Sequence, residues 1–254
     1  MLRTEKIIEE LKNLGVEPPK IVYYALTDST NTRAKEYAKE NVNSKETVVF
    51  IANRQSAGRG RRGRSFVSEG GAGIYMSILT YPDEKGADAT SVTAKTAVCM
   101  ARAVESLCDC KIEIKWVNDL YLGGKKLAGI LTEGEMNKNG KIAFQVVGMG
   151  INIYKSAISD EISAIATSLE DQCASPPDRS ALAARMIKEF LFSPTDCYEE
   201  YKARSFVIGK EVSVIKLTES YKARVVDIDK DFSLIINRDG ETERLFTGEI
   251  SLKI

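Results

Sequence analysis

The stretch from Ala89 to Ile153 constrains the fold more than any other part of the chain, because two kinds of apolar periodicity follow one another in it. Residues 89–108 repeat apolar side chains at helical spacing, which predicts a long helix with a buried face. Strand patterns follow at 111–116, 119–133 and 141–153, with turn residues at 123–124 and 137–140. A long helix followed by strands joined through tight turns predicts an α+β domain built on a mixed sheet.

The residues around this stretch extend the same pattern. We expect helices at 1–15, 32–40, 161–171 and 178–191, and strands at 21–26, 46–52 and 73–80. Polar residues that favour helix N-termini precede the second helix, from Asp28 to Asn31, and Asp178 begins the last one. The sheet therefore gains strands from the N-terminal part of the chain and several helices to cover it.

From about Gly209 onward the pattern changes to short strands at close spacing. These strands are expected at 211–217, 221–228, 232–238 and 241–248, with turn residues between them. Such spacing is typical of a small β-barrel. So few residues form a marginal core alone, and we therefore expect this module to dock on the larger domain.

Composition excludes several classes of function. The chain has 36 Lys and Arg against 36 Asp and Glu, whereas a general nucleic-acid binder carries a basic excess. The five cysteines include no CxxC pair, which argues against a disulfide framework or zinc site and favours a reducing cytoplasm. No segment resembles a signal peptide or a membrane span. The absence of histidine excludes Ser-His and Cys-His catalysis and histidine metal ligands.

The segment GRGRRGR (58–64) lies in the loop between two predicted strands. Its glycines have the spacing of a dinucleotide-binding fingerprint, but a strand follows instead of a helix, so that interpretation fails. An RNA-binding tract of this kind would lie in a disordered tail. A merely solvated loop would leave adjacent guanidinium groups to repel one another, with no acidic run nearby. We interpret the segment as a mobile flap that orders over a phosphate-bearing ligand.

A second cluster of charged and polar residues lies at the end of a predicted strand. Lys115, Asn118 and Asp119 crowd this strand end, and Lys125 and Lys126 begin the next strand across a tight hairpin. A lone lysine on a strand is usually a surface residue. Several cations beside a carboxylate and an arginine flap are, however, what a nucleoside triphosphate with Mg²⁺ requires.

A third feature is the pair of glycines, Gly148 and Gly150, that precedes Asn152 at the end of the last long strand. Glycines there permit the close approach of a flat ligand. A β-bulge explains them equally well.

Together these residues resemble the motifs of the biotin-protein ligases. The matching segments are Ser29-Thr30-Asn31, Gln55 to Arg64, KWVND (115–119), KKLAGIL (125–131), GMGIN (148–152), ATSL (166–169) and GEISL (248–252). Each motif is weak alone. Their order and intervals are specific, and they span nearly the whole chain.

The resemblance implies a biotin/lipoate ligase fold, with a catalytic biotin- and ATP-binding domain at 1–207 and an SH3-like β-barrel at 208–254. It also implies a two-step reaction. Biotin and MgATP give biotinyl-5′-adenylate and pyrophosphate, and the biotinyl group then passes to a lysine of a biotin carboxyl carrier protein. The carboxylate of biotin is the nucleophile in the first step, so the site needs positioning and charge stabilisation and no histidine.

The resemblance also implies a role for individual residues. The implied biotin-binding residues are Ser29, Thr30, Asn31, Gln55, Arg59, Gly60, Arg61, Lys126 and Gly129. The implied nucleotide-binding residues are Arg61, Phe66, Lys115, Asn118 and Asn152. The implied catalytic residues are Lys126, Arg59, Asp119 and Lys115, of which Asp119 would also be the Mg²⁺ ligand and accept the proton of the target lysine.

The chain departs from the family pattern at two positions, where Val117 replaces a proline and Phe66 a tryptophan; phenylalanine can still stack on a base. About twenty residues precede the first predicted strand, too few for the winged-helix DNA-binding domain of some relatives. We therefore expect a monofunctional ligase without specific DNA binding. Some relatives are sheet-edge dimers, and the strands of 111–152 could supply such an edge.

Two alternatives stay open at this point. A lipoate-type ligase would share the chemistry, but it would require a long apolar slot and would not be expected to combine GRGRRGR with Gln55. A non-enzymatic RNA-binding module would use the arginine loop on phosphates and stack bases on Phe66 and Tyr75, and its affinity would fall steeply with salt.

Overall fold

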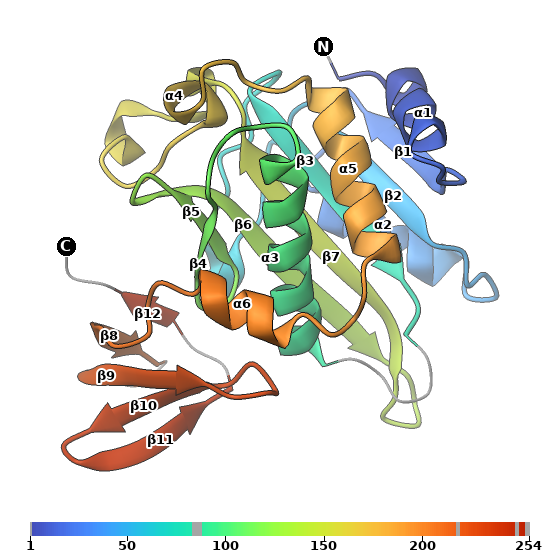
Figure 1. Cartoon of the computed structure of the whole chain (residues 1–254). Coiled ribbons are helices and arrows are strands. Elements are labelled where there is room, and N and C mark those ends of the chain that lie inside the picture. Colours follow the sequence, from blue (N-terminus) through green and yellow to red (C-terminus); the bar gives the residue numbers. More distant parts are fainter. Residues whose placement is uncertain (1, 83–87, 217–218, 247–248, 252–254) are drawn as a thin grey trace.

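The computed structural model describes residues 2–82, 88–216, 219–246 and 249–251. These residues form a large mixed sheet with helices on both faces and a small antiparallel sheet beside it (Figure 1). The predicted α+β architecture with a small C-terminal β domain is confirmed. Some ends of predicted segments lie outside the described residues, namely Leu217, Thr247, Gly248 and Leu252.

The described helices and strands have the following bounds. The helices are α1 (Thr4–Asn13), α2 (Thr30–Glu40), α3 (Ala89–Glu105), α4 (Leu169–Gln172), α5 (Arg179–Phe192) and α6 (Tyr198–Arg204). The large sheet contains β1 (Lys20–Tyr24), β2 (Val48–Ala52), β3 (Gly73–Thr80), β4 (Glu113–Lys115), β5 (Asp119–Leu122), β6 (Lys125–Met136) and β7 (Ile142–Asn152). The small sheet contains β8 (Glu211–Ile215), β9 (Ser220–Ile228), β10 (Leu234–Arg238), β11 (Glu241–Leu245) and β12 (Glu249–Ser251).

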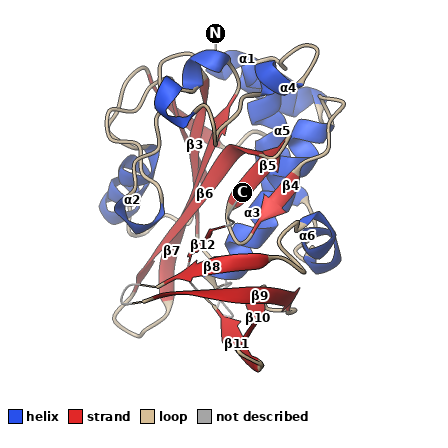
Figure 2. Ribbon diagram, turned by 90° about the vertical axis from the view of Figure 1, so that its left-hand side faces the viewer, coloured by secondary structure: helices blue, strands red, loops and turns tan. Residues whose placement is uncertain are grey.

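The order of the strands makes the large sheet mixed. It runs β1-β2-β3-β7-β6-β5-β4, with β1 and β2 parallel and the other neighbours antiparallel. Helices α3 and α5 cover one face, and α2 lies on the other (Figure 2). The main core includes Ile74 and Ile78 of β3, and a smaller cluster under α2 contains Ala34, Ala38 and Phe50. On the α2 face, the middle of β6 and β7 is left to the loop that follows β2.

The predicted helix at 161–171 is wrong. Within that segment only the 3-10 turn Asp160–Ile162 and the start of α4 are helical. The backbone between them pairs with β6 instead: the Lys126 amide donates to the Ile165 carbonyl at 2.9 Å, and the Thr167 amide donates to the Lys126 carbonyl at 2.9 Å. These hydrogen bonds to a strand replace the helical ones that the apolar spacing favours.

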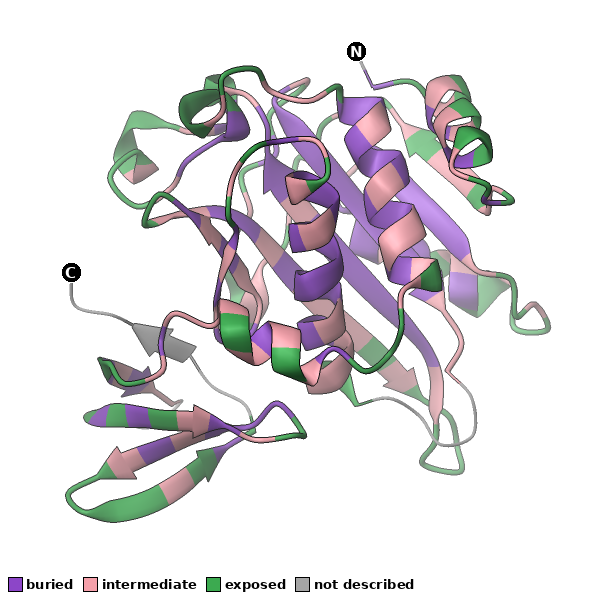
Figure 3. Ribbon diagram, in the orientation of Figure 1, coloured by how far each residue is buried: buried purple, intermediate pink, exposed green. Residues whose placement is uncertain are grey.

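The small sheet shares its core with the large domain. Its strand β9 alternates buried and exposed residues (Figure 3), and Val225 and Ile236 belong to the same apolar cluster as the core under α3. The indole of Trp116 donates to the Phe232 carbonyl at 2.8 Å. The Phe232 ring packs edge-on against Tyr201 of α6, a helix that no sequence pattern indicated. The strand end that carries KWVND is therefore fixed to the C-terminal domain.

The five cysteines, all within the described residues, are free thiols. Of the helices that the structure describes, none has both the length and the apolar character needed to cross a membrane.

Candidate active site

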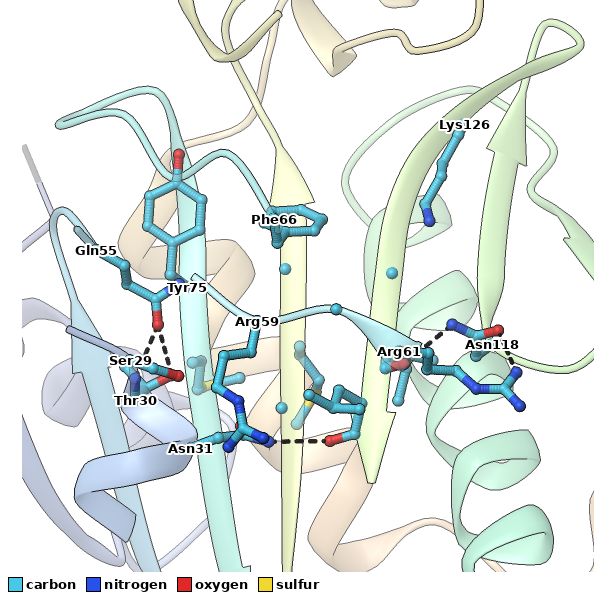
Figure 4. A pocket seen from close by; sticks show the side chains of 18 residues that line it. Ser29, Thr30, Asn31, Gln55, Arg59, Arg61, Phe66, Tyr75, Asn118 and Lys126 are labelled. Carbon is cyan, nitrogen blue, oxygen red and sulfur yellow. Dashed lines mark hydrogen bonds between the residues drawn. The ribbon is translucent and has the colours of Figure 1, made fainter. Parts of the chain in front are cut away.

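A pocket opens on the α2 face of the large sheet, over β3, β7 and β6 (Figure 4). It is lined by Ser29, Thr30, Asn31, Gln55, Arg59, Gly60, Arg61, Phe66, Tyr75, Met76, Asn118, Lys126, Gly129, Ile130, Leu131, Gly148, Met149 and Gly150. The lining thus contains every residue expected to bind biotin. Of the residues expected to bind nucleotide, it contains Arg61, Phe66 and Asn118.

One end of the pocket is lined mainly by uncharged polar side chains. It lies at the start of α2, where the amide of Thr30 donates to the side-chain oxygen of Gln55 at 2.8 Å. The hydroxyl of Ser77 lies 2.7 Å from that of Thr30 and 2.6 Å from the side-chain oxygen of Asn31. Ser29 begins the helix without capping it through its side chain. Buried hydroxyls and amides fixed in this way can bind a polar, neutral group.

The other end of the pocket is cationic. Lys126 lies there with its ammonium 2.7 Å from a carboxylate oxygen of Asp119. Asn118 donates to the same carboxylate at 3.0 Å, and Arg61 donates to the side-chain oxygen of Asn118 at 2.9 Å. The hairpin between β5 and β6 and the arginine loop therefore bring together groups from three segments of the sequence.

The arginine loop crosses the open face of the sheet between these two ends (Figure 4). Arg59 pairs with Glu133 of β6 through nitrogen–oxygen distances of 3.1 and 3.2 Å. The sequence has no acidic run near this loop, and we therefore expected its guanidinium groups to lack nearby carboxylates. That expectation is wrong for Arg59, because β6 brings Glu133 to it from a distant part of the chain.

Glu133 is a residue of the site that sequence reasoning missed. It receives hydrogen bonds from Asn31 and Lys35 of α2, both at 2.9 Å, in addition to its pairing with Arg59. Burial alone would raise the pKa of Glu133, but these hydrogen bonds and the charges of Lys35 and Arg59 hold that pKa below its ordinary value. The four-residue spacing of Asn31 and Lys35, which places them on one helix face, is a signal that could have indicated a common partner.

The two glycines of β7 each make room for a side chain. A Cβ at Gly148 would lie 2.2 Å from the side-chain oxygen of Asn31, and a Cβ at Gly150 would lie 2.6 Å from the Phe66 ring. The pairing of β7 with its neighbours keeps its register at both positions, which excludes the bulge. The flat group against Gly150 in this structure is therefore the ring of Phe66.

Three of the predicted site residues do not line the pocket. Asp119 is adjacent to it through Lys126. Lys115 lies on β4, where its ammonium is 5.9 Å from the centre of the Tyr121 ring. Asn152 is buried at the end of β7 and donates to the Thr167 carbonyl at 3.2 Å, so the segment after Ala166 covers it.

Comparison with known proteins connects this geometry to a family. The profile of the "Biotin/lipoate A/B protein ligase family" matches residues 23–152, and that of the "Biotin protein ligase C terminal domain" matches residues 207–253. All residues that line the pocket lie within the first match.

Three bacterial proteins are similar to this chain along most of its length. The chain is 28% identical to the "Bifunctional ligase/repressor BirA" of Bacillus subtilis, with 91% of this chain and 74% of that protein covered. It is 31% identical to the protein of the same name from Escherichia coli, with 89% and 72% covered. It is 30% identical to the "Biotin--[acetyl-CoA-carboxylase] ligase" of Mycobacterium tuberculosis, with 89% and 86% covered.

The fold is that of a solved relative. The biotin protein ligase from Aquifex aeolicus in complex with biotin and ATP superposes with a TM-score of 0.78 and 24% identity, covering 92% of this chain and 98% of that one. The match of both domain profiles and the identity to the bacterial ligases along most of the chain show that it belongs to the biotin protein ligase family.

Proposed function

We propose that this protein is a biotin-[acetyl-CoA-carboxylase] ligase, which joins biotin to AMP at the expense of ATP and then transfers the biotinyl group to a carrier lysine. The observation that carries the proposal is a single pocket with a neutral polar end at Thr30 and Gln55 and a cationic end at Arg61 and Lys126. Biotin has the matching polarity, with a neutral ureido ring at one end and a carboxylate at the other.

The polar end holds the ureido ring. Ser29, Thr30 and Gln55 supply the hydrogen-bonding groups that a buried ring of this kind requires to offset its desolvation. Asn31 lies beneath them and keeps the start of α2 against β6 through its hydrogen bonds to Leu131 and Glu133. A biotin ring bound here directs its acid chain along β6 and β7 toward the cationic end.

The cationic end stabilises the negative charge of the first step. An oxygen of the biotin carboxylate attacks the α-phosphorus of ATP, the new carboxyl–phosphate bond forms, and pyrophosphate leaves with the electrons of the broken phosphoanhydride bond. Arg61 and Lys126 face the carboxylate and the phosphate. Arg59, which pairs with Glu133 in this structure, is drawn to the same anionic groups, and Gly60 lets the loop approach them closely. The protein needs no nucleophile of its own, which agrees with a site without histidine.

The nucleotide lies on the other side of the loop. Phe66 offers a ring for the adenine, and Asn118 contacts the nucleotide beside Arg61. Lys115 and Asn152 do not line the pocket. We assign Lys115 to the part of the triphosphate that extends past Lys126. We assign Asn152 to the part of the ribose that extends past Gly150.

Mg²⁺ fits this site as a companion of the triphosphate. No group of three or more carboxylate, cysteine or histidine side chains in the described residues could hold a metal by itself. Asp119 is a single carboxylate next to the cationic end, and the phosphates of ATP would supply most of the remaining oxygen ligands. When bound, the ion neutralises part of the triphosphate charge.

The second step uses the same residues. The amine of the carrier lysine attacks the carboxyl carbon of the adenylate, an amide bond forms and AMP leaves. Asp119 accepts the proton of the attacking amine, with Lys126 holding its carboxylate in place. The acceptor is a biotin carboxyl carrier domain, and we place the reaction in the cytoplasm.

A pyrophosphate-release assay with biotin, ATP and Mg²⁺ tests the proposal. We expect release that depends on biotin, followed by labelling of one lysine on a carrier domain. A parallel assay contains lipoate in place of biotin as a control, because the matched family includes lipoate ligases. Release without biotin, or labelling only with lipoate, would show the proposal to be wrong.

A further inference from the structure

Arg62 belongs to the arginine loop, but its side chain leaves the pocket and contacts the C-terminal domain. Its guanidinium donates to the carbonyl oxygen of Ile215 at 2.7 Å. Ile215 is the last residue of β8 and pairs with β9 and β12, so its carbonyl is held by the small sheet. The contact joins residues more than 150 positions apart in the sequence.

The backbone of Arg62 has an unusual conformation for a residue with a side chain. Its φ and ψ angles are 55° and 37°, in the left-handed region that glycine adopts most readily. Glycines stand at positions 60 and 63 of the same loop. An arginine at position 62 is therefore unfavourable for the backbone, and its side chain contact with Ile215 is the feature in the structure that offsets this.

The C-terminal domain is a fixed support for such a contact. Trp116 donates to Phe232 from one side, and the hydroxyl of Tyr201 donates to the Val117 carbonyl at 3.1 Å. These bonds hold the small sheet, α6 and the strand end that precedes Asn118 in one arrangement. A loop residue bound to the small sheet is thereby bound to the frame of the cationic end.

Three successive loop side chains thus reach three different supports. Arg59 reaches Glu133 of β6, Arg61 reaches Asn118, and Arg62 reaches the small sheet. The partners of Arg59 and Arg61 lie at the pocket. The partner of Arg62 is an uncharged carbonyl outside it, so this bond survives when an anionic ligand draws the other two arginines to itself.

We propose that Arg62 is a positioning residue that latches the arginine loop to the C-terminal domain and so encloses the acyl-adenylate between the two steps. The proposal rests on the proposed function. The latch is a single hydrogen bond to a neutral acceptor, and its opening lets the carrier lysine reach the adenylate without breaking an ion pair.

The test compares Arg62→Asn with the wild-type chain. Asparagine tolerates the left-handed conformation, so this change removes the reach of the side chain and keeps the backbone of the loop. Adenylate is formed on the enzyme, excess ligands are removed, and its escape into solvent is followed. We expect the adenylate to escape about tenfold faster than from the wild type, which corresponds to the loss of roughly one hydrogen bond from a charged donor. Adenylate formation should slow less than twofold.

Two matched variants separate the latch from the loss of charge. Arg64→Asn removes the same charge from the same loop but leaves the contact with Ile215, and we expect it to accelerate escape less than Arg62→Asn does. Arg62→Lys keeps the charge and a long side chain with a donor, and should restore most of the retention. Equal escape from the wild type and Arg62→Asn, or equal acceleration by Arg64→Asn, would overturn the proposal.

A second measurement needs no ligand and therefore distinguishes failure of the latch from failure of the proposed function. The amides of Gly60 and Phe66 are hydrogen-bonded across the loop, to Arg64 at 2.7 Å and to Gly58 at 2.9 Å. Their hydrogen exchange in the ligand-free protein should accelerate in Arg62→Asn, and more than in Arg64→Asn. Unchanged exchange in Arg62→Asn refutes the latch, whereas a wild type that forms no adenylate refutes the proposed function alone.

Discussion

Replacement of Gly148 by alanine should damage the polar end of the pocket, because Asn31 lies directly against this glycine. The added Cβ would lie 2.2 Å from the side-chain oxygen of Asn31 and 3.0 Å from its carboxamide carbon. Carbon and oxygen atoms that are not bonded stay more than 3 Å apart, so the carboxamide must retreat by about 1 Å in a closely packed site. Asn31 is only 3% exposed, so water cannot replace the hydrogen-bond partners that its side chain loses.

The magnitude follows from the hydrogen bonds that this retreat breaks. Asn31 accepts from Ser77 at 2.6 Å and donates to the Leu131 carbonyl at 3.2 Å and to Glu133 at 2.9 Å. A buried polar group left without its partner costs about 1 to 3 kcal/mol, and at least two groups are affected. Alanine recovers up to about 1 kcal/mol by restricting the unfolded chain. We expect a net destabilisation of about 2 to 3 kcal/mol.

The measurement is urea unfolding of Gly148→Ala beside Gly134→Ala, a matched change in the neighbouring strand. At Gly134 the nearest atoms to an added Cβ are 3.6 Å away, an ordinary contact. Gly134→Ala should therefore change the free energy of unfolding by less than about 1 kcal/mol. If Gly148→Ala is no less stable than Gly134→Ala, the close approach of Asn31 to β7 does not hold the site together.

The remaining predictions concern charged residues in the pocket and beside it. Lys126→Ala should slow adenylate formation by about 10²- to 10³-fold in a single-turnover assay, because the developing phosphate charge loses a cation. The melting temperature should stay nearly unchanged, because the Lys126 side chain is partly exposed. Near-normal adenylate formation would remove Lys126 from the mechanism. Arg61→Ala should speed escape of the adenylate more than it weakens biotin binding measured by calorimetry, and the reverse order would contradict its place at the phosphate. Glu133→Gln should destabilise the protein by about 2 kcal/mol at neutral pH. Because the pKa of Glu133 in the folded protein lies below its ordinary value of 4.5, this difference should be full above about pH 4.5 and shrink as the pH falls through the lowered pKa, and a difference that grows in acid would refute the assignment. Residues 58–64 should gain hydrogen-exchange protection when biotin and ATP are added together, and full protection in the free enzyme would contradict a closing loop.

Local sequence patterns predicted the elements whose own residues determine them. The strand at 73–80 has the predicted bounds, and Asp178 caps α5 through the amides of Ser180 and Ala181 as expected. The segment 161–171 was mispredicted because its backbone hydrogen bonds go to Lys126, a partner far away in the sequence. Apolar spacing carries no information about such a partner.

The same limit applies to the site. Motif residues such as Gln55, Arg61 and Lys126 meet at one pocket, as the sequence predicted. The partners of Arg59 and Arg62, which are Glu133 and Ile215, could not be identified from the sequence, since both contacts join distant segments. Asn152 donates to the Thr167 carbonyl and is covered by it. Thr167 belongs to the segment 161–171, whose structure was mispredicted.

The apolar cluster that joins the two sheets makes the protein one unit of unfolding. It runs from Leu11 of α1 through the large sheet to Ile236 and Leu245 of the small one. Heat or denaturant should therefore abolish the small sheet and the pocket on the large sheet in a single transition. A substitution as remote from the pocket as Ile236→Ala should lower the fraction of folded molecules, and with it the fraction that has a pocket. The affinity of the molecules that remain folded for biotin should not change.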